Sequence, residues 1–179
     1  MDTESQGQER PSDGADSVDM HLARWQGKAP FDARVEGIIT RIQLLAKLVG
    51  RAKDRALAEV GLQEFEFATL HQLSAREAPD RATPSELAAE LMLSPAGMTG
   101  RLDTLEQSGL VRRVRSSQDR RRVDVELTEA GRARWLAAMK LRGQAENSMV
   151  APLDPAEQDT LNTLLKRMLI QAESDSRPR

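Results

Sequence analysis

The chain has 179 residues, 39% of them hydrophobic and only 3% aromatic, with a formal net charge of -2 at pH 7. This length and composition predict one mainly helical domain with a core rich in Leu and Ala. There is no apolar run of about 18 residues, no segment typical of a secretory signal and no cysteine, which excludes a membrane span, disulfides, thiolate zinc sites and sensing by thiol oxidation. We therefore expect a cytoplasmic protein without a bound metal or cofactor.

The first 20 residues are strongly acidic. Six carboxylates against one arginine give this segment a charge of -5, which leaves +3 for the remaining 159 residues. Large apolar side chains are nearly absent from it, and such a composition predicts disorder over residues 1–18. We interpret the segment as a solubilising tail, with a functional acidic arm as the alternative. Its charge conceals a basic region further along the chain.

A long helix that ends at Gly61 is predicted next. Its apolar residues step by three and four and form one continuous seam: Val35, Ile38, Ile42, Leu45, Val49, Ala52 and Ala56. Such a seam needs a partner, which lies either in the chain's own core or in a second copy of the chain. A shorter helix bearing Trp25 is expected before it, within Met20 to Lys28. We assign residues 19–62 to dimerisation.

A helix is expected from Glu64 to Glu77. After it, two further helices are predicted to begin in the same way, with a Thr or Ser cap followed by Pro. Thr83-Pro84-Ser85-Glu86 is a capping box, in which the Thr hydroxyl and the Glu carboxylate bind free backbone N–H groups. Ser94-Pro95 starts a second helix, the reading helix, which ends at Gly109. Its apolar face carries Met98, Leu102 and Leu105. This order predicts a helix-turn-helix.

The opposite face of the reading helix is small and polar. It carries Ala96, Gly97, Gly100 and Thr104, with Thr99 and Arg101 on its flanks. Small residues let a helix enter the major groove of DNA, which is about 12 Å wide, and the first residues of such a helix meet the base edges. Ser94 and the backbone amides beside it suit a phosphate. The alternative is that the two glycines allow close packing against a neighbouring helix.

An arginine-rich hairpin follows. Val111 and Val114 open one strand, residues 116–118 form a polar turn, and the returning strand is predicted to be half-buried because Val123, Val125 and Leu127 alternate with Asp124 and Glu126. Between residues 111 and 122 the single acid Asp119 stands against six arginines: Arg112, Arg113, Arg115, Arg120, Arg121 and Arg122. Arginine at a hairpin tip can enter the minor groove. An isolated basic run is typical of a charged surface loop, but beside two Pro-capped helices it favours nucleic acid and completes a winged helix-turn-helix over residues 63–127.

Two more helices are predicted over residues 128–175. Thr128 caps the first, which bears Trp135, Leu136 and Met139, and Asp154-Pro155-Ala156-Glu157 opens the second. The second carries a further apolar seam of Leu161, Leu164, Leu165 and Met168. We assign both to dimerisation, with packing in the chain's own core as the alternative. Two-fold symmetry would set two reading helices roughly 34 to 36 Å apart, about one turn of DNA.

Several motifs make the chain similar to a known family. They are Leu87-Ala88, Leu93-Ser94-Pro95, Met98-Thr99, Leu102-Asp103, Leu105-Glu106, Gly109-Leu110-Val111 with Arg113, Asp119-Arg120-Arg121, and Leu127-Thr128-Glu129-Ala130-Gly131. The chain resembles the multiple-antibiotic-resistance regulator (MarR) family of bacterial transcription factors, closely in these motifs and more loosely from about Arg34 to the last helix. The resemblance implies a homodimer that binds a pseudo-palindromic promoter site as a repressor and releases it on binding a small aromatic or phenolic ligand. It also implies that Asp119 braces Arg121 and that Arg121 reaches the minor groove.

Two positions depart from the family pattern. Many relatives carry a basic residue where this chain has Gly100 and another where it has Thr104. The reading helix here therefore has one basic residue, Arg101, against two acids, Asp103 and Glu106. Phosphate contacts supply most of the non-specific affinity for DNA. The wing and its strands must therefore supply much of that affinity here.

The resemblance also implies an effector pocket between the dimer helices and the winged helix-turn-helix of residues 63–127, which we call the reading module. Its expected lining is Trp25, Phe67, His71, Trp135 and Met139. A mostly apolar lining with His71 as a polar anchor favours a planar aromatic ligand. A Trp in an extra amino-terminal helix resembles the urate-responsive branch of the family, but Ala68 and Ala75 stand where that branch has an Asp and an Arg, so urate is not the expected ligand. The alternative for Trp25 is packing that holds the added helix.

Catalysis is not expected. Only His21 and His71 are present, no glycine-rich loop follows a strand, and no carboxylates have metal-ligand spacing. The candidate DNA-binding residues are Ser85, Ser94, Pro95, Ala96, Gly97, Thr99, Gly100, Arg101, Thr104, Arg113, Asp119, Arg120, Arg121 and Arg122. The remaining alternative is a winged-helix module that binds another protein through the same surface, without specific DNA binding.

Overall fold

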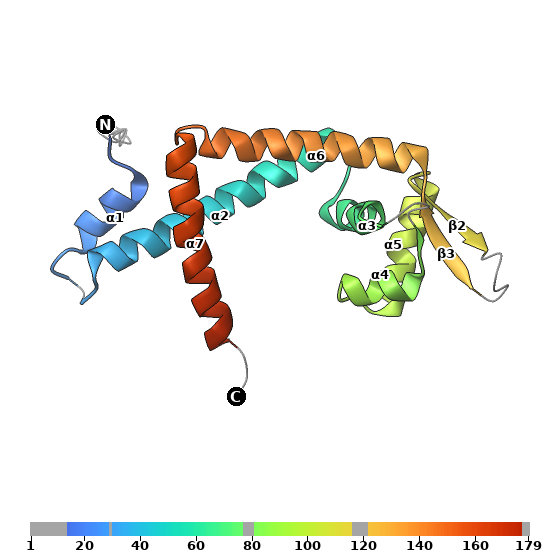
Figure 1. Cartoon of the computed structure of the whole chain (residues 1–179), viewed down its shortest axis with the longest axis horizontal. Helices are drawn as coiled ribbons and strands as arrows, with labels where there is room; N and C mark the ends of the chain where they lie inside the picture. The colour runs from blue at the N-terminus through green and yellow to red at the C-terminus, as the bar shows by residue number, and fades with distance from the viewer. Residues whose placement is uncertain (1–13, 29, 77–80, 116–121, 177–179) are drawn as a thin grey trace, which may run out of the picture. The chain divides into compact units, whose positions relative to one another are not determined.

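The computed structural model describes residues 14–28, 30–76, 81–115 and 122–176 (Figure 1). The chain divides into two compact units, Met1–Gly50 and Arg51–Arg179. The described residues form seven helices and one three-stranded sheet, which confirms the mainly helical fold with a small β-wing that the sequence predicts. The second unit holds both the helix-turn-helix and the wing.

In the first unit, helix α1 (Ser17–Trp25) begins inside the segment expected to be disordered. Asp16 caps it by accepting hydrogen bonds from the N–H groups of Val18 (2.8 Å) and Asp19 (2.9 Å). Arg41 then bridges both carboxylates, with Nε 2.8 Å from Asp16 and Nη2 2.6 Å from Asp19. The helix therefore starts before the predicted Met20, because two acids among the first 20 residues have a partner far along the chain. Residues 1–13 of that tail lie outside the described residues.

The apolar seam of helix α2 (Ala33–Glu59) has two environments. In the first unit, Val35, Ile38 and Leu45 are 57%, 51% and 52% exposed. In the second unit, near the end of the helix, Ala56 and Leu57 are buried. Part of the seam thus belongs to the chain's own core, and the rest is apolar surface. The chain turns after the helix at Gly61, whose φ of +65° favours glycine.

The core of the second unit lies among α3 (Glu64–Ser74), α4 (Pro84–Glu90) and α5 (Pro95–Gln107). Its fully buried side chains include Leu70, Leu73, Leu87, Met98, Leu102 and Leu105. The apolar face predicted for the reading helix, which is α5, is therefore confirmed. Helix α3 ends at Ser74, before the predicted Glu77, and the Ala75 N–H closes it by donating to the His71 carbonyl at 3.1 Å.

Both predicted caps of the helix-turn-helix are present. In α4, the Glu86 N–H donates to Thr83 Oγ1 (3.2 Å), and the Glu86 carboxylate accepts from the Thr83 N–H (2.7 Å). In α5, Ser94 Oγ accepts from the Gly97 N–H at 3.1 Å. A cap of this kind typically contributes about 1 kcal/mol to stability. Two local signals in the sequence thus fix where both helices begin.

The wing strands β2 (Val111–Arg115) and β3 (Val123–Leu127) pair antiparallel, with Val111 opposite Leu127 and Arg115 opposite Val123. A third strand, β1 (Arg81–Ala82), pairs with the other edge of β3, so the strand order is β1-β3-β2. Strand β1 was not predicted, because two residues are too few to show alternation. The consequence is that β3 is the central strand of the sheet.

The predicted alternation along β3 is wrong at three positions. Val125 and Leu127 are buried as expected, but Val123 is 39% exposed and the side chains of Asp124 and Glu126 are buried. The reason is that arginine side chains of β1, β2 and residue 122 cover the second face of the central strand and bind its carboxylates. Carboxylates expected on the solvent side of the hairpin are therefore internal partners of its arginines.

Helix α6 (Glu129–Val150) begins at the base of the wing and runs past α3 (Figure 1). Thr128 Oγ1 accepts from the Gly131 N–H (2.9 Å) and donates to the Gly109 carbonyl (2.7 Å). A Cβ at Gly131 would clash with the backbone carbonyl of Leu110, so glycine is required there. These contacts tie α6 to the junction between α5 and β2.

Helix α7 (Pro155–Asp175) starts at the predicted Asp154 capping box and has no buried residue. Its apolar residues are 41% to 59% exposed: Leu161, Leu164, Leu165, Met168, Leu169 and Ile170. Among the described residues, no helix combines the length and the hydropathy needed to cross a membrane.

Candidate nucleic-acid interface

The outward face of α5 carries no bulky side chain. Pro95, Ala96, Gly97, Thr99, Gly100 and Thr104 are all exposed. A Cβ at Gly100 would meet nothing within 4 Å, and one at Gly97 would meet only Ser94 Oγ, the cap of the same helix, at 3.2 Å. The two glycines therefore do not serve close packing within the described part of the chain. They leave an open, shallow helix surface.

Two threonines on this face have fixed hydroxyl groups. Thr99 Oγ1 donates to the Pro95 carbonyl (3.0 Å), and Thr104 Oγ1 donates to the Gly100 carbonyl (3.1 Å). Since each hydroxyl proton is in use, each threonine offers an acceptor oxygen and a γ-methyl group. Such a side chain can accept from the exocyclic amine of adenine or cytosine, or contact the methyl group of thymine.

The start of α5 offers one free amide rather than several. Pro95 has no N–H, and the Gly97 N–H is bound to Ser94 Oγ, so the Ala96 N–H is the only first-turn amide without a partner among the residues described. Because the Ser94 oxygen acts as an acceptor, its proton stays available to a phosphate. Ser85, in the first turn of α4, is also exposed. The two helix starts thus offer separate small donors.

Arg101 is the only basic residue of α5, and it lies against an aromatic ring. Its guanidinium carbon is 5.2 Å from the centre of the Phe65 ring, in the first turn of α3. Both side chains are half-buried. This separation is that of a cation–π contact. Phe65 was not predicted as a site residue, since no local pattern links it to Arg101.

Arg113 connects the wing to the reading helix. Its guanidinium contacts Asp103 at 2.6 Å and also Glu106, and its backbone N–H donates to Glu106 at 3.0 Å. The backbone hydrogen bond from Arg113 is the main cause that lowers the pKa of Glu106, and the hydrogen bond to Asp103 raises the pKa of Arg113. Arg113 was predicted to contact DNA. In the free chain it holds two carboxylates of α5, and the DNA contact stays a prediction.

Two further arginines of the hairpin, Arg112 and Arg122, also have carboxylate partners. Glu126 lies between Arg81 (3.1 Å) and Arg112 (2.9 Å), and the hydrogen bond from Arg112 is the main cause that lowers its pKa. Arg122 contacts Asp124 at 2.7 Å. The basic hairpin is thus partly neutralised from within. Its free positive charge is smaller than the sequence predicted, because these carboxylates were expected to face solvent.

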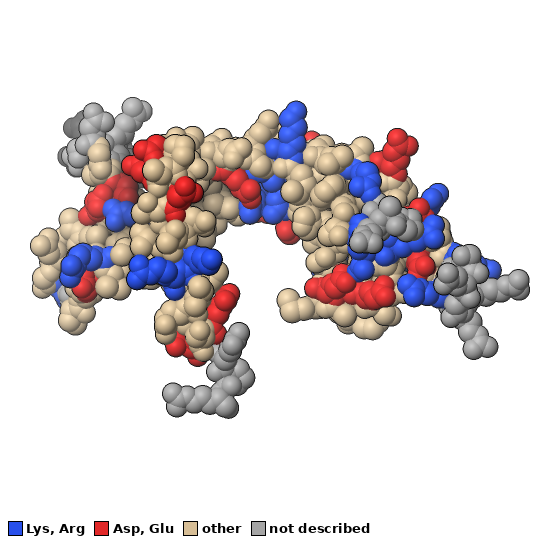
Figure 2. Space-filling view, viewed as in Figure 1, with Lys and Arg blue, Asp and Glu red and all other residues tan. Residues whose placement is uncertain are grey.

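The tip of the wing was predicted to hold the minor-groove contacts. Asp119, Arg120 and Arg121 lie outside the described residues, so their roles stay predictions. On the described strands, Arg115 is exposed beside the tip and Arg122 flanks it on the other side. Figure 2 shows Lys and Arg side chains gathered over the wing and its base, with carboxylates between them.

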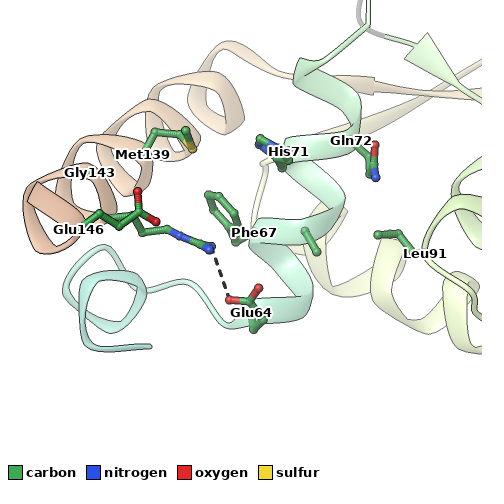
Figure 3. A pocket seen from close by; sticks show the side chains of 10 residues that line it. Glu64, Phe67, His71, Gln72, Leu91, Met139, Gly143 and Glu146 are labelled. Atoms are coloured by element: carbon green, nitrogen blue, oxygen red, sulfur yellow. Dashed lines mark ion pairs between the residues drawn. The ribbon is translucent and has the colours of Figure 1, made fainter. Parts of the chain in front are cut away.

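A cavity of about 360 Å³ lies between α3 and α6. Phe67 and His71 point into it from α3, and Met139 points toward them from α6 (Figure 3). The His71 and Phe67 rings are stacked, with centroids 5.5 Å apart, and His71 Nδ1 accepts a hydrogen bond from Trp135 Nε1 at 3.2 Å. Three of the five predicted pocket residues thus line this cavity, and Trp135 contacts one of them, His71.

The fifth residue, Trp25, lines a different cavity. With His21, Phe31 and Glu36 it borders a space of about 230 Å³ in the first unit. The Trp25 and His21 ring centroids are 6.5 Å apart. Trp25 was grouped with the α3 and α6 residues through the family resemblance; it belongs to the first unit and they belong to the second, so that grouping stays a prediction.

An arginine that was not predicted, Arg142, lines the α3–α6 cavity. The Arg142 guanidinium lies 4.2 Å from the centre of the Phe67 ring and only 16% of the side chain is exposed. Its Nη1 atom is 3.6 Å from Glu64, the ion pair drawn as a dashed line in Figure 3, and has no hydrogen-bond partner among the described residues. Arg142 follows Met139 by one helical turn. That spacing was a signal in the sequence that it would share the lining.

Comparisons with known proteins agree with the winged helix-turn-helix fold. Residues 62–123 match the model of the MarR family. Over 148 residues the chain is 33% identical to the HTH-type transcriptional regulator PecS of Dickeya dadantii, and the match covers 82% of this chain and 89% of PecS.

Solved structures share the fold. The YusO protein of Bacillus subtilis superposes with a TM-score of 0.70 at 20% identity, over 79% of this chain and 98% of YusO. A mutant of S. aureus MepR, solved bound to an oligodeoxyribonucleotide, gives 0.62 at 22% identity, over 75% and 97%. Together with the winged helix-turn-helix of the second unit, the extent of the match to PecS places this chain in the MarR family of transcriptional regulators, which are not enzymes.

Proposed function

We propose that the protein binds a pseudo-palindromic promoter site in double-stranded DNA as a homodimer and represses transcription from it. The observation that carries this proposal is the outward face of α5, which is exposed, free of bulky side chains and not used for packing in the described chain. A surface of this shape fits the major groove. The oligodeoxyribonucleotide in the MepR structure supports the same use of the fold.

Helix α5 and the wing contribute to the affinity for DNA in different ways. On α5, Asp103 and Glu106 outnumber Arg101, but both carboxylates are bound by Arg113, which reduces their repulsion of phosphates. The arginines of the wing supply most of the counterion release, and α5 supplies fit to the base edges. Specificity and affinity should therefore respond to different substitutions.

The exposed apolar faces support a homodimer. Val35, Ile38 and Leu45 on α2 and the whole apolar face of α7 lack cover within the described chain. Contiguous apolar surface of this kind marks an interface between proteins. A two-fold dimer presents two α5 helices to successive major grooves, roughly 34 to 36 Å apart.

The α3–α6 cavity supports regulation by a planar aromatic acid. Phe67 offers a ring face, and the buried Arg142 Nη1 lacks a hydrogen bond that a carboxylate would provide. Because His71 Nδ1 accepts from Trp135, the neutral imidazole carries its proton on Nε2 and can donate to the ligand. A ligand there contacts α3 of the reading module and α6, which holds the base of the wing. It favours dimers whose reading helices no longer match the half-sites, to the extent that it prefers that state.

DNA binding is tested with duplexes from the region upstream of the protein's own coding sequence, measured from low to high salt against a scrambled duplex. We expect a salt-dependent affinity for both duplexes and a preference of at least about 10³-fold for the specific one. If neither duplex binds while a protein partner is retained by the same surface, the winged-helix interaction module is the correct alternative.

Ligand release is tested by adding salicylate or its neutral amide to the protein–DNA complex at fixed salt. Salicylate should release the DNA and the amide should be much weaker, because only the acid pairs with Arg142. Arg142→Gln should weaken salicylate binding roughly ten- to a hundred-fold, the range of a charge-assisted hydrogen bond. Lys140→Gln, the same charge loss at an exposed position of α6, is the matched control. Equal potency of the acid and the amide would remove Arg142 from the proposed site.

A further inference from the structure

Phe65 differs from the other aromatic residue of early α3 in its surroundings. Phe67 is 5% exposed and belongs to the hydrophobic core, whereas Phe65 is half-buried and is not part of that core. The helix backbone at Phe65 is held by Thr69, whose Oγ1 donates to the Phe65 carbonyl at 2.9 Å. A large aromatic side chain therefore lies at the edge of the reading module without filling its core.

The Phe65 ring contacts Arg101, the only basic residue of the reading helix. The Arg101 guanidinium carbon is 5.2 Å from the ring centre. Two carboxylates of the same helix, Asp103 and Glu106, are engaged by Arg113 instead. In the free chain, Arg101 is thus held by a ring and not by an ion pair with these acids. A ring contact leaves the guanidinium N–H groups able to bind a guanine edge or a phosphate.

A free arginine loses much rotamer freedom when it is ordered against DNA. A contact that already restricts the side chain in the free protein reduces this cost at the moment of binding. The position of Arg101 also suits a contact with DNA, because this residue lies one turn after Gly97 on the flank of the exposed face. We propose that Phe65 is a positioning residue for specific recognition: it holds Arg101 beside the open face of α5, ready to contact the operator. This inference rests on the proposed DNA-binding function.

A double-mutant cycle on the full-length protein tests the inference. Operator and scrambled duplexes are titrated at one salt concentration with the wild type, Phe65→Leu, Arg101→Ala and the double variant. We expect Phe65→Leu to weaken operator binding about two- to five-fold, the size of a partly exposed cation–π contact, and to affect the scrambled duplex less. In the Arg101→Ala background, Phe65→Leu should have no further effect. Phe65→Tyr, which keeps a ring, should restore the preference for the operator.

Several results would overturn the inference while leaving DNA binding intact. They are full operator affinity in Phe65→Leu, an equal loss in the Arg101→Ala background, a gain in affinity that would mean Phe65 sequesters Arg101, or no effect of Arg101→Ala itself. Failure of the wild type to prefer any promoter duplex would instead overturn the proposed function. If Phe65→Leu does not fold, ring-fluorinated phenylalanine at position 65 replaces it. Operator affinity that falls with each added fluorine supports the inference, and constant affinity contradicts it.

Discussion

Glu106 of the reading helix accepts a hydrogen bond from the backbone N–H of Arg113, the third residue of the wing strand β2, at 3.0 Å. The Arg113 guanidinium binds the same carboxylate and also reaches Asp103 at 2.6 Å. Because one of these bonds involves the strand backbone, it orients the whole strand and not only a side chain. The angle between the two elements expected to enter adjacent grooves is therefore set in part by this pair.

Removal of the Glu106 carboxylate should loosen the wing. For Glu106→Ala we expect a loss of about 1 kcal/mol or less in the free energy of unfolding, since water screens a pair this exposed. Operator affinity should fall by more than stability does, because two contact regions lose their fixed relation. Glu106→Gln keeps an acceptor and should lie between the variant and the wild type. Denaturant unfolding and fluorescence anisotropy measure the two quantities, and full operator affinity in Glu106→Ala would show that the pair does not align the wing.

Gly100→Ala should separate stability from function. A Cβ at this position meets nothing within 4 Å, so the free protein should gain about 1 kcal/mol in helix stability. Operator affinity should fall, because the added methyl group lies on the face that enters the groove. Gly50→Ala, also without a neighbour within 4 Å, should give the helix gain alone. A stabilised Gly100→Ala protein with wild-type operator affinity would mean that position 100 is not in close contact with the base pairs.

Arg121→Ala tests the tip of the wing, which lies outside the described residues. We expect operator affinity to fall by about 1 to 3 kcal/mol if the arginine makes a specific groove contact, with a melting temperature within a few degrees of the wild type. Arg34→Ala removes the same charge from a side chain that is 91% exposed on α2 and should leave affinity nearly unchanged. The wing assignment would not survive an Arg121→Ala protein that binds a verified operator as tightly as the wild type.

Leu165→Glu tests the dimer. This residue is 41% exposed on the apolar face of α7, and a carboxylate there should oppose burial against a second copy. We expect the wild type to be a dimer at micromolar concentration and the variant to lose dimerisation and operator binding together. Thr163→Glu adds the same charge on the opposite side of the helix and should retain both. Sedimentation equilibrium decides the matter, and a stable folded wild-type monomer would contradict the assembly.

Local signals in the sequence predicted the helix-turn-helix well. Thr83, Ser94 and Asp154 cap helices as their motifs indicate, and Gly61 and Gly109 follow helices with φ of +65° and +70°. These features depend on residues within one turn of each other, so short motifs determine them. The fold family and the starts of helices α4 and α5 could therefore be predicted from the sequence alone.

Partners far apart in the chain were not predictable in the same way. Arg81 and Glu126 are 45 residues apart, and the two-residue strand β1 that brings them together has no periodicity. The burial of Asp124 and Glu126 depends on the same third strand. Phe65 contacts Arg101 of another helix, and no local pattern in the sequence indicates this contact. The spacing of Arg142 from Met139 indicated that Arg142 lines the cavity, but not that it contacts Phe67 and Glu64. The helices and strands that carry the candidate site were thus predictable, but the ion pairs among their side chains were not.

The central claim is that two copies of the α5 face read successive major grooves of one promoter. Hydroxyl-radical and methylation footprinting of the wild-type protein on its operator tests this claim most directly. We expect two protected major-groove regions about 10 base pairs apart, related by two-fold symmetry, with minor-groove protection beside each from the wings. Gly100→Ala should weaken the major-groove protection first. A single asymmetric footprint, or protection of the minor groove alone, would contradict the claim.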